Sequence, residues 1–366
     1  MKLFNTYFLV LCCFSALAQD KTHTSYVDTN YFGGYIGLHN NEILHLIQEH
    51  PSGVILSWNK KTFGFEDWEQ RFNYPDYGFS LAYQNFNNPV LGNNVSIYAH
   101  YNFYFLNRNL MFRIGQGLAH NSNPYDRETN FKNVAFGSTL MSSTYAMINY
   151  KKERIFDRFG LQAGFSLIHY SNANVKAPNN GTNTIAFNLG VTYNLDEEVL
   201  EYQKTLDKKA DKKFTEPIRY NVVFRSGINQ SDLIGSGQYP FYIFSGYVDK
   251  RINRKSALQV GTDVFFSNFL KELIRFRSVA FPNEGLSGDE DFKRIGVFVG
   301  HELFVNKTSL LSQLGYYVYY PFEFEGRVYI RAGLKRYFGK KWFGAVTLKS
   351  HGFRAEAVEF GIGLRL

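Results

Sequence analysis

The chain has almost no cysteine. Its 366 residues include only Cys12 and Cys13, which lie side by side near the N-terminus. A disulfide scaffold is therefore excluded, and so is thiolate chemistry in the rest of the chain. Proline is also rare, with 9 residues. Beyond the N-terminus no apolar run is long enough for a membrane-spanning helix, which excludes a helical membrane protein.

The N-terminal residues have the pattern of a secretory signal peptide. Lys2 gives a positive start, residues 8–16 are mostly apolar, and Ala16-Leu17-Ala18 is typical of a cleavage site. We therefore expect residues 1–18 to be a signal peptide and residues 19–366 to form an exported protein.

Aromatic side chains are abundant. The chain has 36 Phe and 26 Tyr, together with 31 Gly, yet its mean hydropathy is only -0.28. Transmembrane β-barrels combine these properties, because their apolar residues alternate with polar ones along each strand.

The alternation is visible in residues 94–105. Val95 and Ile97 fall on one face, whereas His100 and Asn102 fall on the other. A period of two indicates a strand, and an apolar outer face with a polar inner face is typical of a barrel in lipid. Two further clear examples, with arginines on the polar face, are residues 218–229 and 327–335.

Counting such segments from about residue 31 predicts an all-β fold: a transmembrane antiparallel barrel of 14–16 strands. Residues 196–217 interrupt the pattern, because they are charged and nearly lack aromatics. We expect them to form a periplasmic loop that could include a short helix. This loop divides residues 31–195 from 218–366. One large barrel is the simpler interpretation, and two barrel-like halves are the alternative.

Polar residues continue the apolar face of one predicted strand. In residues 159–171 the odd-numbered side chains face lipid, and His169 and Ser171 keep that register at the outer rim. Asn183 has the same place on the next strand. Because residues 172–182 would join the two strands as a hairpin, these three side chains can converge at the level of the lipid headgroups.

These residue types suit acyl transfer. Ser171 would attack an ester carbonyl, His169 would take its proton, and Asn183 would orient the histidine. Backbone N–H groups after Ser171, or the amides of Asn172 and Asn179, could form an oxyanion hole. This mechanism requires neither a metal nor another cofactor.

The site residues lie within a longer motif, His169-Tyr170-Ser171-Asn172-Ala173 followed by Pro178-Asn179-Asn180-Gly181. The motif resembles the signature of the lipid A 3-O-deacylase (PagL-like, acyloxyacyl hydrolase) family. The resemblance implies an outer-membrane esterase whose partner is lipopolysaccharide, and which releases a 3-O-linked fatty acid from lipid A. That family has a glutamate where Asn183 stands in this chain.

A triad of Ser, His and Asn is also similar to outer membrane phospholipase A, which uses calcium. Residues 172–182 contain no Asp or Glu, which disfavours a calcium site there, but the phospholipase alternative stays open.

A second copy of the short pattern occurs at His120-Asn121-Ser122-Asn123. No Pro-Asn-x-Gly sequence follows it, and Val134 stands at the position that corresponds to Asn183. We expect this copy to be a rim loop. A non-catalytic pore or structural barrel remains as an alternative of another class. The net charge of +8 is spread along the chain, so nucleic acid is not an expected partner, and the oligomeric state is left open.

Overall fold

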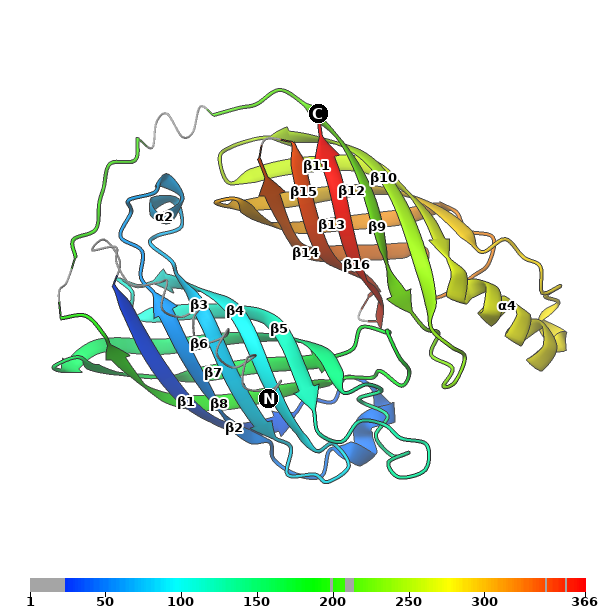
Figure 1. Cartoon of the computed structure of the whole chain (residues 1–366), viewed down its shortest axis with the longest axis horizontal. Helices are drawn as coiled ribbons and strands as arrows, with labels where there is room; N and C mark the ends of the chain where they lie inside the picture. The colour runs from blue at the N-terminus through cyan, green and yellow to red at the C-terminus, as the bar shows by residue number, and fades with distance from the viewer. Residues whose placement is uncertain (1–23, 198–199, 208–213, 340, 353) are drawn as a thin grey trace, which may run out of the picture.

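Two closed barrels make up the protein (Figure 1). The computed structural model describes residues 24–197, 200–207, 214–339, 341–352 and 354–366, so the expected signal peptide lies outside the described residues. Sixteen strands form two antiparallel barrels of eight strands each. Strand β8 pairs with β1, and β16 pairs with β9, which closes each half separately. The predicted strand count is confirmed, whereas the single large barrel is wrong.

The first barrel contains eight strands and two short helices. The helices are η2 (Asn41–Leu46), between β1 and β2, and α2 (Asp67–Arg71), between β2 and β3. The strands are β1 (Ser25–Ile36), β2 (Ser52–Lys60), β3 (Asp76–Asn85), β4 (Asn93–Phe105), β5 (Leu110–Asn121), β6 (Leu140–Phe156), β7 (Phe159–Ser171) and β8 (Thr182–Asn194).

The second barrel has the same antiparallel order. The connection between its third and fourth strands contains α4 (Asn268–Ala280) and the short η3 (Pro282–Glu284). The strands are β9 (Arg219–Asn229), β10 (Tyr239–Arg251), β11 (Ser256–Ser267), β12 (Lys293–Val305), β13 (Thr308–Tyr319), β14 (Val328–Phe338), β15 (Trp342–His351) and β16 (Arg354–Arg365).

Each barrel has one end with long connections, here called the loop end. The opposite ends carry mostly short turns and the connection from β8 to β9, and are called the linker ends. The described parts of residues 196–217 contain no helix. Of the helices in the described chain, none is long and apolar enough to cross a membrane.

The outer wall of each barrel is apolar, as the alternation predicted. On β7 and β8, Phe165 and Phe187 are exposed and their rings pack edge to face on the outside of the barrel. Gln162 and Ser166 on the alternate face of β7 are buried. This is the pattern expected for strands that face lipid on one side and a filled interior on the other.

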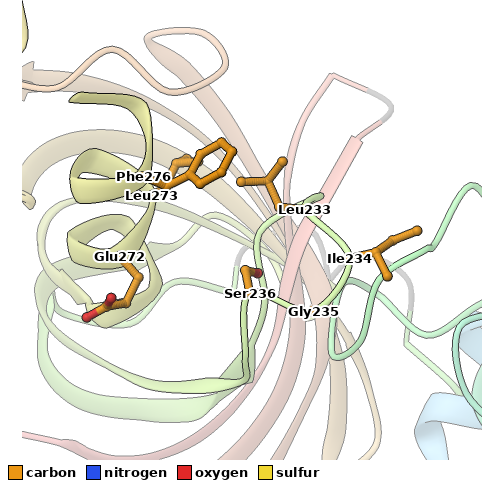
Figure 2. Close-up of a pocket in the computed structure, with 7 residues that line it drawn as sticks. All are labelled: Leu233, Ile234, Gly235, Ser236, Glu272, Leu273 and Phe276. Atoms are coloured by element: carbon orange, nitrogen blue, oxygen red, sulfur yellow. The ribbon is translucent and has the colours of Figure 1, made fainter. Parts of the chain in front are cut away.

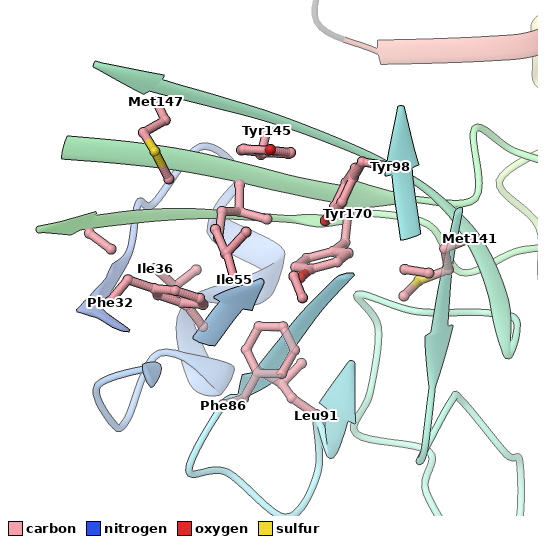
Figure 3. Close-up of a cluster of buried hydrophobic side chains, with 14 of the residues drawn as sticks. Phe32, Ile36, Ile55, Phe86, Leu91, Tyr98, Met141, Tyr145, Met147 and Tyr170 are labelled. Atoms are coloured by element: carbon pink, nitrogen blue, oxygen red, sulfur yellow. The ribbon is translucent and has the colours of Figure 1, made fainter. Parts of the chain in front are cut away.

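The interior of the first barrel is divided along its length. Nearer the linker end, the fully buried Arg113 donates to Asp28, with Nη2 and Oδ2 2.7 Å apart. Toward the loop end the filling is aromatic and aliphatic (Figure 3). The prediction of a polar interior therefore holds for only part of this barrel. The labelled cluster residues are Phe32, Ile36, Ile55, Phe86, Leu91, Tyr98, Met141, Tyr145, Met147 and Tyr170.

The interior of the second barrel is dominated by ion pairs. Arg331 binds both Asp263 and Glu359, at 2.8 and 2.6 Å, and all three side chains are fully buried. Removal of charges from water is unfavourable unless each charge has a close partner of opposite sign. Arg331 is such a partner for both Asp263 and Glu359. Since eight strands enclose just enough space for side chains, two filled interiors disfavour the pore alternative.

Candidate active site

The three residues predicted to converge lie next to one another at the loop end of the first barrel. His169 and Ser171 are two residues apart on β7, so both side chains belong to its outward face. Asn183 on β8 is the direct cross-strand partner of His169. Asn172 and Asn179 belong to the connection between the two strands, residues 172–181, which we call the site loop.

The imidazole of His169 contacts the side chain of Asn183. Nδ1 of the histidine lies 2.8 Å from Oδ1 of the asparagine. An amide oxygen can only accept a hydrogen bond, so in this contact Nδ1 carries the proton and donates it. In the neutral ring, Nε2 then has a free lone pair and can act as a base.

Ser171 is buried, with 8% of its surface exposed. Its Oγ donates to Oδ1 of Asn179 at 3.1 Å and accepts from the backbone N–H of Ala173 at 2.9 Å. Among the described residues, no hydrogen bond joins Ser171 to His169. The two side chains are nevertheless close to each other, since both lie beside Gly181. A Cβ added at Gly181 would lie 3.5 Å from His169 Cε1 and 3.5 Å from Ser171 Cβ.

Asn172 and Asn179, the two predicted site residues in the site loop, differ in orientation. Asn179 turns its oxygen toward Ser171 and also accepts from the backbone N–H of Asn172 at 2.8 Å. The Asn172 side chain points back into the loop, where its Nδ2 donates to Lys176 O at 2.7 Å. The group that donates to Ser171 Oγ is therefore the backbone N–H of Ala173, and Asn172 and Asn179 shape the loop around it.

The far end of the site loop is held by the connection between β5 and β6. The backbone N–H of Gly181 donates to Ala135 O at 3.0 Å, and that of Asn180 donates to Val134 O at 3.3 Å. His39, from the connection between β1 and β2, places Nε2 2.9 Å from Asn180 O. Residues 179–181 are therefore fixed by other loops of the same barrel.

A row of polar side chains crosses the outer wall at the level of His169. Thr144 on β6 is the cross-strand partner of His169, and Gln116 on β5 is the partner of Thr144. Thr144 donates to Gln116 Oε1 at 2.5 Å. One step further from the loop end the wall is apolar. That next row consists of Ile185, Leu167, Ala146 and Ile114.

Two other histidines, His120 and His351, lack this arrangement. His120 on β5 lies between Val95 and Leu140, so its cross-strand neighbours are apolar. His351 on β15 has a carboxylate partner, with Nε2 2.7 Å from Glu356 Oε2, but this pair is buried inside the second barrel. Among the described residues, no three His, Cys, Asp or Glu side chains form a group that could hold a metal ion.

A cavity of about 300 Å³ lies on the second barrel, between the β9–β10 connection and α4 (Figure 2). It contains none of the five predicted site residues. Its lining is Leu233, Ile234, Gly235, Ser236, Glu272, Leu273 and Phe276.

The fold, with its apolar outer walls, is that of a transmembrane β-barrel protein. Two family models indicate which kind of transmembrane β-barrel protein it is. The model described as lipid A 3-O-deacylase (PagL) matches residues 52–192, and the model described as acyloxyacyl hydrolase, C-terminal domain, matches residues 218–366. The chain belongs to the PagL-like family of lipid A deacylases, which are outer-membrane hydrolases. The first match lies on the first barrel and the second match on the second.

No curated protein sequence matches the chain. Solved structures that match it include a mutant of the Rhodopseudomonas blastica porin, at 8% identity and a TM-score of 0.18, covering 94% of this chain and 99% of that one. A mutant of the TodX monoaromatic hydrocarbon channel matches at 7% identity and a TM-score of 0.17, covering 95% and 90%.

Sequence reasoning missed two features of the site. The polar row through Thr144 and Gln116 becomes visible only when strand register is known, although Gln116 is a polar residue between Ile114 and Leu118 on the outward face of β5. The contacts of the site loop with the second barrel, described below, involve residues more than fifty positions apart, and no local pattern marks them.

Proposed function

We propose that the protein hydrolyses an acyl ester of lipid A on the outer wall of its first barrel. In this proposal Ser171 is the nucleophile, His169 is the general base, and Asn183 is a positioning residue. The observation that carries it is the His169–Asn183 hydrogen bond beside Ser171, on a lipid-facing wall of a chain from a lipid A deacylase family. An enzyme whose substrate is a membrane lipid needs its reactive groups on that wall.

The reaction has two stages. Ser171 Oγ attacks the ester carbonyl while its proton moves to His169 Nε2, and the resulting imidazolium protonates the departing sugar hydroxyl. A water molecule then attacks the acyl-enzyme, again losing its proton to His169. The fatty acid leaves and Ser171 regains its proton. In both stages negative charge develops on the carbonyl oxygen, where the Ala173 N–H can stabilise it.

Ser171 must change one partner before it reacts. In the structure its hydroxyl donates to Asn179, and rotation about χ1 would redirect the hydroxyl toward His169 Nε2. Catalytic hydrogen bonds often tighten only when substrate is bound. The rotation would also release the Ala173 N–H from Ser171 Oγ, which makes this donor available to the substrate.

The outer wall fits a lipid with a polar head and apolar chains. The row of Asn183, His169, Thr144 and Gln116 presents hydrogen-bonding groups at one depth, and the next row toward the linker end is apolar. An ester bond between a sugar and an acyl chain lies at the same kind of boundary. The acyl chain would lie on Leu167 and Ile185, and the sugar would lie above it.

The proposed function also implies an orientation of the barrels in the membrane. The loop ends face the outside, where lipid A resides, and the charged connection of residues 196–217 lies in the periplasm. Export through a signal peptide at residues 1–18 belongs to the same proposal. Residues 31–195 would then form the deacylase part, and residues 218–366 the remaining strands.

The test is acyl release by the detergent-folded full chain. Purified lipid A and diacyl phospholipid are incubated separately with the wild type and with Ser171→Ala, and the released acids are identified by mass spectrometry. We expect a hydroxy fatty acid from lipid A, lost in Ser171→Ala. Ser122→Ala, in the second copy of the motif, serves as the matched control and keeps activity.

Two results would contradict the proposal. Turnover of phospholipid alone would favour the phospholipase alternative. Release from neither substrate by a folded protein would favour a non-catalytic barrel.

A further inference from the structure

The segment that follows Ser171 has an unfavourable backbone conformation. Ala173 and Asn174 have φ angles of +52° and +60°, in the left-handed region that side chains other than glycine rarely adopt. The Ala173 N–H contacts Ser171 Oγ because the chain turns in this way. Such conformations persist only when surrounding contacts hold them, so the source of those contacts matters for the site.

The second barrel supplies these contacts through the β9–β10 connection. The backbone N–H of Gln230 donates to Asn174 O at 2.8 Å, and Asn174 Nδ2 donates to Asp232 Oδ1 at 3.2 Å. Gln238 Nε2 donates to Val175 O at 2.7 Å. Within the described chain, every hydrogen bond that reaches residues 173–177 from outside residues 171–181 comes from this connection.

The side chain of Gln230 is part of the contact between the β9–β10 connection and the site loop. Its side chain is buried, with only 5% of the residue exposed. Its Oε1 accepts from the Ala177 N–H at 3.4 Å, and its Nε2 donates to Leu233 O at 2.9 Å. A buried amide that is satisfied on both sides holds one orientation. The contact between the barrels is therefore specific at the site loop.

A chain of hydrogen bonds connects the second barrel to the nucleophile. Asp232 accepts from Asn174, whose Oδ1 accepts from Asn179 Nδ2 at 3.1 Å. Asn179 in turn accepts from Ser171 Oγ through its own oxygen. The same asparagine that holds the left-handed turn thus connects Asp232 to Asn179. A shift of the connection would move both the Ala173 N–H and the Asn179 carbonyl.

We propose that the β9–β10 connection of the second barrel positions the catalytic loop of the first, with Gln230, Asp232 and Gln238 as positioning residues that act through Asn174 and its neighbours. This inference rests on the proposed function. It gives the second barrel a role in the reaction although it contributes no reacting atom. The energetic reason is that left-handed residues are unfavourable without surrounding contacts, and the connection adds four hydrogen bonds to those that the site loop makes within itself.

The test removes two exposed side-chain contacts and leaves the barrel interiors intact. In Asp232→Ala/Gln238→Ala we expect kcat for acid release from lipid A to fall about tenfold, with KM changed less than twofold, because substrate contacts remain while the nucleophile and oxyanion donor lose their alignment. Perturbing residues outside a site by loss of such contacts commonly has effects of this order. Asp232→Asn/Gln238→Ala should recover part of the loss, since an asparagine oxygen also accepts from Asn174.

A second measurement does not depend on the reaction. Hydrogen–deuterium exchange of the wild type and variants reports on the amides of residues 173–177, which we expect to exchange at least several-fold faster in the double variant. Ser236→Ala is the matched control, because Ser236 belongs to the same connection and, among the described residues, its side chain bonds only to that of Ser231. It should leave kcat and exchange unchanged.

The outcomes separate this inference from the proposed function. Unchanged kcat in the double variant overturns the positioning role, even if exchange becomes faster. Equal loss in Ser236→Ala also overturns it, because a general disturbance of the connection would then explain the effect. If the wild type releases no acid, the proposed function fails, and unchanged exchange in the double variant additionally overturns the support that the second barrel is inferred to give.

Discussion

Each barrel has a histidine near the loop end of its seventh strand, but the two side chains point in opposite directions. His169 on β7 belongs to the outward face and bonds to Asn183. His351 on β15 points inward and bonds to Glu356. The adjacent serines show why this matters. Ser171 is two residues from His169 and shares its face, whereas Ser350 directly precedes His351 and therefore lies on the other face.

The difference shows that strand register determines the role of a residue type. A shift of one position moves a side chain from the lipid-facing wall to the interior. In the first barrel the register places serine, histidine and asparagine together in reach of lipid. In the second barrel it places the histidine among buried charges, where Arg294 and Lys349 also bind Glu356. The first histidine can meet a substrate, and the second contributes to packing of the interior.

Substitution of the two histidines should have the largest effects, on activity for His169 and on stability for His351. His169→Gln should lower the rate of acyl release by roughly 10⁴-fold or more, because the only base is removed, with little change in thermal unfolding. His351→Gln should do the opposite. It should keep the activity per folded molecule and lower stability by about 1–3 kcal/mol through the loss of a buried hydrogen bond. Acid release and thermal unfolding in detergent measure both, and a loss of activity in folded His351→Gln would break the contrast.

Asn183 is expected to have the next largest effect. Asn183→Ala should lower the rate by about ten- to a thousandfold, since the orienting member of a triad sets the tautomer of its histidine. Asn183→Glu gives His169 the kind of carboxylate partner that His351 has, and it should keep activity within about tenfold of the wild type. Steady-state kinetics on lipid A compares the two variants. Near-normal activity of Asn183→Ala would mean that another group orients His169.

Glycines in the corresponding hairpins give a smaller, matched comparison. Gly181 and Gly352 have similar φ angles, +64° and +59°. A Cβ at Gly181 would lie 2.6 Å from Tyr170 O and close to both His169 and Ser171, whereas a Cβ at Gly352 would meet nothing within 4 Å. Both alanine variants should lose about 1–2 kcal/mol of stability from the left-handed backbone, and Gly181→Ala should lose more, because its Cβ would also meet Tyr170 O. Only Gly181→Ala should also lose activity, by about tenfold, and equal rates for the two would contradict the proposed site.

The smallest expected effect is that of a chelator. Addition of EDTA should change the rate of lipid A deacylation less than twofold, since the proposed mechanism uses only Ser171, His169 and Asn183. A rate that falls with EDTA and returns with calcium would point to the phospholipase alternative. The assay is the same acid release, with Ser171→Ala as the blank.

Much of the fold could be predicted from the sequence because alternation is a local property. The apolar outer face of β7 and β8, the strand count and the division at residues 196–217 all follow from residues that are close in the chain. Closure into two barrels did not follow. It depends on whether β8 pairs with β1 or with a later strand, and that choice is decided by pairing between residues 148 to 168 positions apart. The helix α4 was missed because alternation with a period of two does not mark a helix.

Local sequence patterns were enough to show which residue types stand at the candidate site, and that His169 and Ser171 share a face, because the period of a strand is two. They also placed Asn183 on the neighbouring strand. Three features required the folded structure: Asn183 is the direct partner of His169, the Ala173 N–H rather than the Asn172 amide contacts Ser171, and the second barrel contacts the site loop. These depend on register and on contacts between distant segments, which local sequence patterns do not encode.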